Sequence, residues 1–300
     1  MIGISTCWWN GKLHKGEELF KELLAIPVDG IELEYRIPEP LFNEIKDRLK
    51  KEINIISIHN FFPFPEEFLG KKRPSGDLIP LSCPDRYERE IAIKLTKRTI
   101  EVASELEARY VILHLGYVEM DIEKKDFYKR LMEKDDTEDY IKKLLKEKEE
   151  KRQRYMDSVL LSIDALNREA IKREVFLGIE NRYYPHEIPD FKELGIILKE
   201  FEGGNVGYWH DMGHAIVQEN ANIIPQDMLL KTYADYLLGV HVHDVKGFND
   251  HLPPGRGKVD FGRIARLLKE GIPKVLEVES HFSIDDIISS LGVLKESGIR

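Results

Sequence analysis

Hydrophobic residues along this chain alternate between two spacings. Short segments in which every second residue is apolar are each followed by a longer segment with apolar residues three and four positions apart, and these are the periods of strands and helices. Strands are predicted at residues 2–8, 28–35, 53–59, 110–115, 175–180, 206–211, 237–243 and 274–279. Eight strands in strict alternation with helical segments are typical of a closed (β/α)8 barrel, whose active site lies at the carboxyl ends of the strands. An open doubly wound sheet is the alternative, but no G-x-G-x-x-G follows the first strand.

Two segments interrupt this alternation. Residues 60–84 have no periodicity and combine five prolines with four phenylalanines. A loop of this length inside a compact domain is usually a lid or a binding loop, so we expect a lid here. Residues 118–155 are dominated by Lys, Glu and Asp and predict a charged helical insertion after the fourth strand, which merges into one long helix ending near Arg173. A charge run of this kind is typically a solvated helix face.

The composition allows one large barrel domain over residues 1–300. Hydrophobic residues make up 42% of the chain, and α/β barrels commonly reach this length. The formal net charge is −9, and an acidic surface repels phosphate backbones at long range. A nucleic-acid partner is therefore not expected, whereas a homo-oligomer is left open.

Cysteine usage and the N-terminus favour a reducing compartment. Cys7 and Cys83 lie far apart and form no C-x-x-C pair, so neither a disulfide framework nor a cysteine-rich zinc site is expected. The N-terminus shows no basic leader followed by an apolar segment. No run approaches the roughly 18–20 apolar residues that a membrane span needs. We therefore expect a cytoplasmic protein without a membrane partner.

The strand ends carry the candidate chemistry. From the second strand onward, the last residue on the face opposite the aliphatic one is always a carboxylate or an imidazole: Glu34, His59, His114, Glu180, Asp211, His241 or His243, and Glu277 or Glu279. Apolar layers fill a barrel below this level, so such a ring of groups is costly unless its charges are compensated. A divalent metal is the simplest compensation. Nitrogen and carboxylate ligands suit Mn, Zn, Co or Fe, and Mg where oxygen dominates.

Each of these residues also has an ordinary structural interpretation. Glu180 could pair with Arg182 in an ion pair, and Asp211 could cap the helix that follows it. Aromatic residues such as Trp8 and Phe61 more often pack in a core or a lid than contact a substrate. The same class of residue at seven strand ends is, however, poorly explained by separate structural roles, which favours a shared site.

Several short motifs together resemble the xylose-isomerase-like TIM-barrel superfamily. They are I-E-N at residues 179–181, H-D-M-G-H at 210–214, H-V-H-D-V-K at 241–246, D-H-L-P-P-G-R-G at 250–257 and L-E at 276–277. This superfamily includes sugar and sugar-phosphate isomerases and epimerases, and the endonuclease-IV-type AP endonucleases. The resemblance covers essentially all eight βα units. Its motifs are specific for the superfamily and separate its members poorly.

In the epimerase branch, the resemblance implies one divalent metal held from strands five to eight. The matching positions here are Glu180, Asp211, His241 and Glu277. His241 is preferred to His243 because its H-x-x-D spacing is the one that matches. Glu180 and Glu277 are also the implied catalytic carboxylates: one removes the proton next to a carbonyl of the sugar and the other returns it.

The resemblance also implies residues that contact the sugar. His214 matches a substrate contact, and Arg256 lies in a loop that often supplies a substrate-binding arginine. Arg182 is a further candidate, because a guanidinium can bind hydroxyl or phosphate oxygens. Trp8 and Phe61 are candidate contacts to the sugar ring.

The endonuclease branch implies a site with three zinc ions. His59, His114, His214 and His251 match histidines of that set, but Asn249 stands where an aspartate is expected. A neutral amide is a weaker ligand than a carboxylate, which favours a site with fewer metals. We therefore expect a metal-dependent sugar or sugar-phosphate isomerase or epimerase acting on a small-molecule sugar, with a zinc-dependent AP endonuclease as the alternative.

Overall fold

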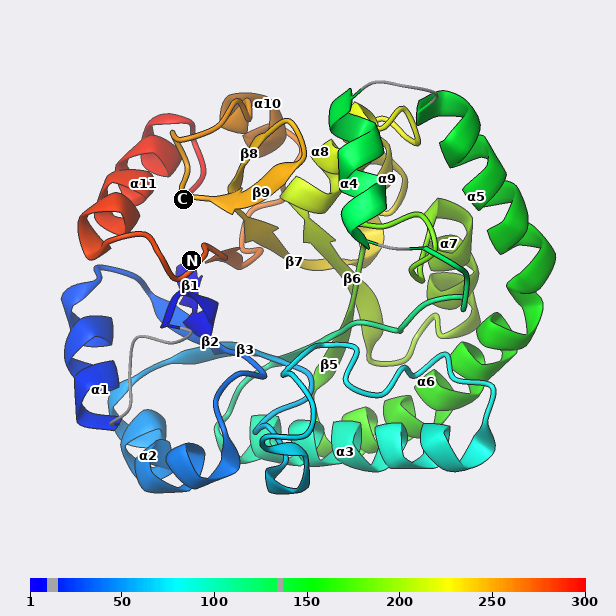
Figure 1. The fold of residues 1–300 in the computed structure, drawn as a ribbon. Helices are drawn as coiled ribbons and strands as arrows, with labels where there is room; N and C mark the ends of the chain where they lie inside the picture. The colour runs from blue at the N-terminus through cyan, green and yellow to red at the C-terminus, as the bar shows by residue number, and fades with distance from the viewer. Residues whose placement is uncertain (10–15, 123, 134–136) are drawn as a thin grey trace.

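The strands of this protein form a closed barrel at its centre (Figure 1). The computed structural model describes residues 1–9, 16–122, 124–133 and 137–300. Within them, eight parallel strands are hydrogen-bonded in the order β1-β10-β7-β6-β5-β4-β3-β2. They are β1 (Ile2–Ser5), β2 (Gly30–Leu33), β3 (Ile55–His59), β4 (Tyr110–Leu113), β5 (Phe176–Glu180), β6 (Val206–Asp211), β7 (Leu237–Val242) and β10 (Lys274–Leu276). The predicted barrel is confirmed.

Helices cover the outside of the barrel (Figure 1). The α-helices are α1 (Gly16–Ala25), α2 (Glu39–Glu52), α3 (Arg86–Glu105), α4 (Lys124–Glu133), α5 (Thr137–Lys151), α6 (Gln153–Arg173), α7 (Phe191–Glu200), α8 (Met212–Asn220), α9 (Met228–Thr232), α10 (Phe261–Ala265) and α11 (Ile284–Glu296). Short 3₁₀ turns lie at Thr6–Trp9, Glu66–Phe68 and Ala234–Tyr236. A small antiparallel hairpin, β8 (Asp244–Lys246) and β9 (Asn249–Leu252), follows β7. Among the described helices, none is both long and apolar enough to cross a membrane.

Alternation along the strands separates an outer core from an inner one. Ile31 and Leu33 of β2 belong to the large cluster shared with the helices, and Glu32 between them faces the interior, where it contacts His241. Below this polar level, the barrel is filled by a small cluster that includes Ile112 and Trp209. The predicted orientation of the second strand is therefore confirmed.

The alternation of β3 is interrupted near its start. Period-two alternation counted back from His59 would place Ile55 inside and Ile56 outside, but Ile55 packs in the outer cluster and Ile56 in the inner one. The register between β2 and β3 shifts, so that Ile31 is opposite Ile55 and Glu32 is opposite Ser57. The extra residue on β3 reverses the alternation locally, as a β-bulge does.

The charged segment forms separate helices rather than one. α4 and α5 precede α6, and the turn at Arg152 separates α5 from α6. Phe127 of α4 and Leu144 of α5 are buried in a second cluster that includes Val217 of α8. The charged side of the segment is a solvated helix face, as predicted: Lys142 and Lys146, for example, are exposed. The apolar side packs on the loops and helices at the end of the barrel.

One lysine of this segment is almost completely buried. The Nζ of Lys148 donates to the backbone oxygen of Glu187 at 2.8 Å, and it pairs with the carboxylates of Glu193 at 2.8 Å and Asp190 at 3.2 Å. Asp190 caps α7 in a capping box with Glu193. The insertion is thus tied to the segment that joins β5 to α7.

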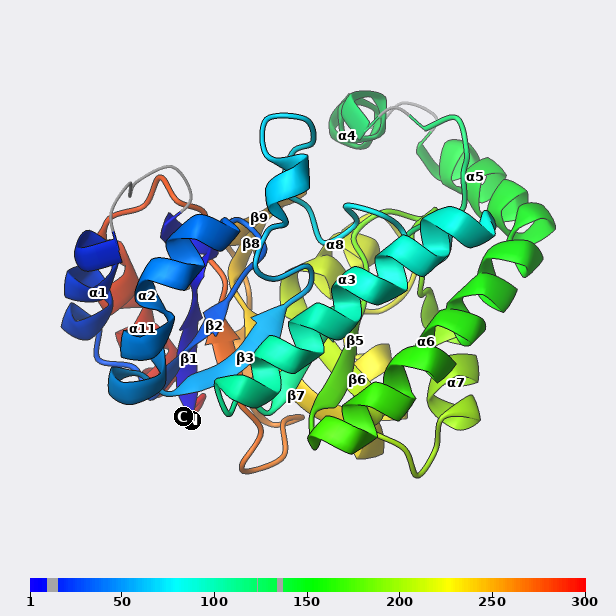
Figure 2. The same ribbon diagram turned by 90° about the horizontal axis from the view of Figure 1, so that it is seen from below.

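The loop of residues 60–84 and α4 lie at the same end of the molecule, opposite the end where the two termini lie (Figure 2). Phe61, Phe62 and Phe64 are buried in the main core, so they anchor the loop rather than line an open surface. Closure of this loop over the site stays a prediction.

Candidate functional site

Four strand ends bring a compact group of ligand atoms together. Glu180, Asp211, His241 and Glu277 each offer one ligand atom, and these atoms all lie within 4.8 Å of one another. The Nδ1 of His241 is 3.1 Å from Glu277 and 3.3 Å from Glu180. Asp211 and His241 are directly opposite each other in the register of β6 and β7. The parallel register therefore places these side chains at one level of the barrel.

A fifth residue of this group, Glu32, was not predicted. Its Oε2 accepts a hydrogen bond from Ser57 at 2.7 Å and lies 3.1 Å from the Nε2 of His241. A carboxylate on one ring nitrogen fixes the orientation of a histidine and leaves the other nitrogen for a metal. The prediction stopped at the last inward residue, Glu34, which instead pairs with Arg36 at 2.7 Å. Glu32 lies one inward step deeper on the same strand.

The buried carboxylates and imidazoles of this group stabilise each other's charged forms. Burial opposes ionisation of Glu180, but His114 and His241 outweigh it and hold the pKa of Glu180 well below its usual range. Burial would lower the pKa of His241, whereas Glu277, Glu32 and Glu180 together raise it well above the ordinary value. The carboxyl group of Glu180 is thus ionised at neutral pH. A positive charge among the carboxylates is what stabilises the group.

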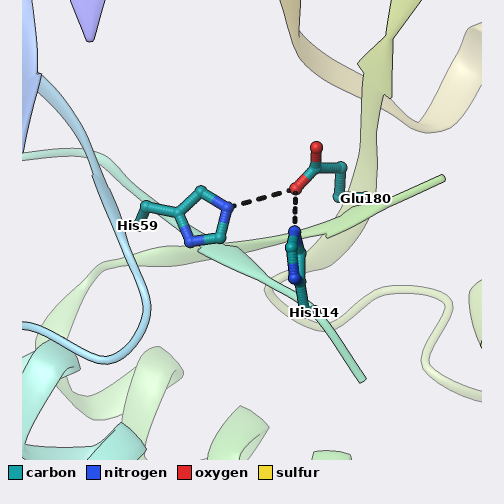
Figure 3. A group of neighbouring side chains, drawn as sticks. All are labelled: His59, His114 and Glu180. Carbon is teal, nitrogen blue, oxygen red and sulfur yellow. Dashed lines mark hydrogen bonds and ion pairs between the residues drawn. The ribbon is translucent and has the colours of Figure 1, made fainter. Parts of the chain in front are cut away.

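Two further groups of ligand atoms share residues with the first. His59 and His114 point their Nε2 atoms at the same oxygen of Glu180, at 3.2 Å and 2.9 Å (Figure 3). The other oxygen of Glu180 faces His241. The third group consists of Asp211, His214 and His251. Because Glu180 and Asp211 each belong to two groups, all three groups are adjacent.

His243 plays a different part from His241. Its Nδ1 accepts a hydrogen bond from the backbone of His251 at 2.8 Å, so Nε2 carries the proton and donates to Asp211 at 3.0 Å. Both ring nitrogens are occupied by protein groups. The geometry therefore supports His241 rather than His243 as a candidate ligand, as the motif spacing suggests.

The hairpin after β7 supplies a carboxylate next to the expected position. Asn249 is exposed, but an oxygen of Asp250 lies 3.1 Å from the Nδ1 of His251 and another lies 3.8 Å from the Nε2 of His214. Burial would lower the pKa of His251, but Asp250 raises it to about 10. The carboxylate that is missing at position 249 is thus present one residue later.

A cavity of about 550 Å³ opens over these groups. Its lining includes these members of the three groups and their neighbours: His59, His114, Glu180, His214, Asp250, His251 and Glu277. Arg182, a predicted substrate contact, also lines it and is buried; its Nη2 pairs with Asp77 at 2.7 Å and with Glu187 at 3.1 Å. Asp77 comes from the loop of residues 60–84 and is also 3.3 Å from the Nδ1 of His114. This loop therefore contributes a charged group that sequence analysis did not identify.

Three predicted substrate contacts lie elsewhere in the structure. Arg256 is largely exposed and pairs with Asp286 of α11. Trp8 is buried and donates from its indole nitrogen to the backbone oxygen of Phe282 at 2.9 Å, and Phe61 packs in the main core. For these residues, the structure provides no contact with the cavity.

Hydrogen bonds to Asp244 fix the loop that carries Arg256. The carboxylate of Asp244 accepts them from the backbone of Val245, Gly255, Gly257 and Val259 at 2.8–3.0 Å. A side chain at Gly257 would come within 2.3 Å of that carboxylate. The loop is therefore wrapped tightly around Asp244, and Arg256 is directed toward α11.

Comparisons with known proteins agree with this architecture. The model of the family described as xylose isomerase-like TIM barrel matches residues 20–297. The chain is 26% identical over 234 residues to the uncharacterized protein MJ1311 of Methanocaldococcus jannaschii, covering 74% of this chain and 67% of that one. D-psicose 3-epimerase from Clostridium cellulolyticum H10, solved with D-tagatose, superposes with a TM-score of 0.69 at 14% identity, over 99% of both chains. IOLI protein with a bound zinc atom superposes with a TM-score of 0.65 at 15% identity, over 99% of this chain and 95% of that one. At these identities the structural matches establish the fold.

Proposed function

Because the chain belongs to the xylose isomerase-like TIM barrel family, we propose that it is a metal-dependent isomerase or epimerase of a sugar or sugar phosphate. The observation that carries this proposal is the group formed by Glu180, Asp211, His241 and Glu277 at the base of the cavity. Two of its carboxylates, Glu180 and Glu277, line the cavity itself. The superposition with sugar epimerases such as D-psicose 3-epimerase supports the same class of reaction.

The donor set of this group fits a divalent cation. Three carboxylates and one imidazole that carries a carboxylate on its other nitrogen are ligands typical of Mn, Zn or Co. The thiol of Cys7 also lines the cavity, but it donates to the backbone oxygen of Val278, and burial raises its pKa well above the ordinary value. It therefore stays protonated and is a poor ligand.

Glu180 and Glu277 are the proposed proton-transfer groups. Both contact His241, from strands β5 and β10 that are separated by β6 and β7 in the barrel, so they approach a sugar from different sides. In the proposed reaction, one carboxylate removes the proton next to the carbonyl and the other returns a proton to the carbon. Return to the opposite face of the same carbon inverts that centre. Return to the neighbouring carbon moves the carbonyl, provided that the hydroxyl proton of the first carbon passes to the former carbonyl oxygen. A divalent cation held here would polarise the carbonyl and stabilise the negative charge that develops on it.

Other residues of the cavity wall are proposed to orient the sugar. The guanidinium of Arg182 is fixed by Asp77 and Glu187, so it can contact hydroxyl or phosphate oxygens without reorganisation. His214 lies between Glu180 and Asp250 and can exchange a hydrogen bond with a hydroxyl. The buried walls exclude water from the carbon that gains and loses the proton.

A zinc-dependent AP endonuclease is the second candidate, because three adjacent groups of ligand atoms share Glu180 and Asp211. Such clusters suit hydrolysis of phosphodiesters. The formal net charge of −9 argues against a nucleic-acid substrate. The sugar reaction therefore remains our proposal.

Metal content distinguishes the two candidates. We expect about one metal ion per chain in protein purified without added metal, measured by elemental analysis. The same analysis on the His241→Ala variant should show loss of that ion, because no other described imidazole approaches Glu180, Asp211 and Glu277 together. Three zinc ions per chain together with efficient incision of duplex DNA at abasic positions would overturn the sugar proposal.

A further inference from the structure

The cavity is much larger than one simple sugar. Its volume is about 550 Å³, which corresponds to about 18 water molecules at roughly 30 Å³ each. Pockets of roughly 300–1,000 Å³ are typical of drug-sized ligands, which are larger than one hexose. A sugar bound over Glu180 and Glu277 would therefore leave a considerable part of the cavity to another group.

One side of this cavity is formed by three tyrosines, Tyr128, Tyr183 and Tyr184, which we call the tyrosine wall. The ring centroids are 5.3 Å apart for Tyr128 and Tyr183, and 4.7 Å apart for Tyr183 and Tyr184. The ring of Tyr183 is 5.8 Å from that of His214, edge to face. The wall thus begins beside the candidate ligands and extends away from them.

Tyr128 reaches this wall because of the insertion. It lies on α4, where its neighbour Phe127 is fully buried against Tyr184, with ring centroids 5.4 Å apart. The ring of Tyr128 contacts those of Tyr183 and Tyr184, with centroids 5.3 Å and 5.7 Å away, and the hydroxyl of Tyr183 donates to the backbone oxygen of Phe248 at 2.7 Å. Tyr128 is therefore held in a defined position over the cavity. The charged insertion thus supplies one wall of the cavity.

The surroundings of the wall indicate which ring would fit against it. Asp250 and Glu187 both line the cavity, and Glu187 accepts a hydrogen bond from the backbone of Tyr184 at 2.8 Å. Glu187 is paired with Arg182 and Asp250 with His251, so this part of the cavity carries little net charge, and its carboxylate oxygens accept hydrogen bonds from hydroxyls. Aromatic faces pack against apolar ring faces. A sugar ring, with a C–H face and a rim of hydroxyls, meets both requirements.

We propose that the tyrosine wall is a subsite for a second, uncharged sugar ring, so that the substrate is a glycosylated sugar rather than a free monosaccharide. This inference rests on the proposed function for the position of the reacting sugar. The reacting ring lies over Glu180 and Glu277, and the attached ring packs on Tyr128 and Tyr183. Specificity for the two-ring substrate then depends on α4.

The test compares D-fructose with its 4-O- and 6-O-glucosyl derivatives. Calorimetric titration of the metal-loaded protein should show that at least one glucosyl derivative binds about tenfold more tightly than D-fructose, as expected for one good aromatic contact. In Tyr128→Ala this ratio should fall close to one. In Tyr128→Phe, which keeps the ring, most of the ratio should remain.

Tyr140→Ala provides the matched control, because Tyr140 of α5 packs at the edge of the same cluster without lining the cavity. The ratio should be unchanged in this variant. Equal binding of the three sugars, or a preference that survives Tyr128→Ala, would overturn the subsite. Exchange of the C–H next to the carbonyl, followed by NMR in D₂O, reports separately on the proposed function: a binding preference without exchange would contradict the reaction and keep the subsite.

Discussion

Replacing Glu180 by glutamine is expected to lower the turnover number by about a thousandfold. The amide cannot accept the proton next to the carbonyl. It also removes the negative charge that faces His59, His114 and His241. The measurement is the rate at which the substrate C–H exchanges for deuterium in D₂O, followed by NMR, with metal content determined on the same sample.

The matched control is Glu200→Gln, which changes an exposed carboxylate at the end of α7. It should exchange at the wild-type rate. If Glu180→Gln retains its metal but no longer exchanges the substrate C–H for deuterium, the defect lies in proton transfer and not in metal binding. Exchange that persists in Glu180→Gln would rule out this residue as the base.

Replacing Lys148 by methionine is expected to lower the free energy of unfolding by about 4 kcal/mol at pH 7, the usual cost of leaving a buried charge without its partner. The side chain has its ammonium group between Glu193 and Asp190, and Glu193 is fully buried. Methionine fills a similar volume but leaves the buried carboxylate of Glu193 without its cation. Urea-induced unfolding, monitored by circular dichroism, measures the difference in the free energy of unfolding between the variant and the wild type.

The loss should be smaller near pH 4 than at pH 7. Burial already raises the pKa of Glu193, in opposition to Lys148, and removal of the lysine raises this pKa further. A carboxyl whose pKa is raised on folding destabilises the fold only above its unfolded pKa of roughly 4.3, so the penalty disappears as the pH falls toward that value. Lys146→Met, an exposed position of α5, should change stability by less than about 0.5 kcal/mol. An equal effect of both substitutions would show that the buried ion pairs contribute nothing.

The ring of candidate ligands could be predicted because strand alternation is a local property. Leu177 and Ile179 face the helices, so Gly178 and Glu180 must face the interior, and the same reasoning reaches Asp211 and His114. The barrel then places all strand ends at one level. Predicting the ring therefore requires only that side chains alternate along each strand and that the parallel strands close into a barrel.

Other parts of the site depend on contacts that no local pattern contains. Asp77 meets Arg182 across 105 positions of the chain, and Lys148 meets Glu193 across 45. Asp77 lies in a segment whose composition predicts a loop, and Lys148 lies in one whose composition predicts a solvated helix. The inversion at Ile56 has a similar cause, because a shift of register between two strands is set by their pairing and not by the sequence of either.

Asp211 performs two tasks with one carboxylate. Besides its place among the candidate ligands, its Oδ1 accepts a hydrogen bond from the backbone of His214 at 2.6 Å and so caps α8. Asparagine or serine would cap a helix equally well but would be a weaker ligand, and glutamate would keep the charge on a longer side chain that is not a preferred cap. Substitution at this position is therefore restricted from two directions, by the cap of α8 and by the candidate ligand set, and of these residues only aspartate meets both demands.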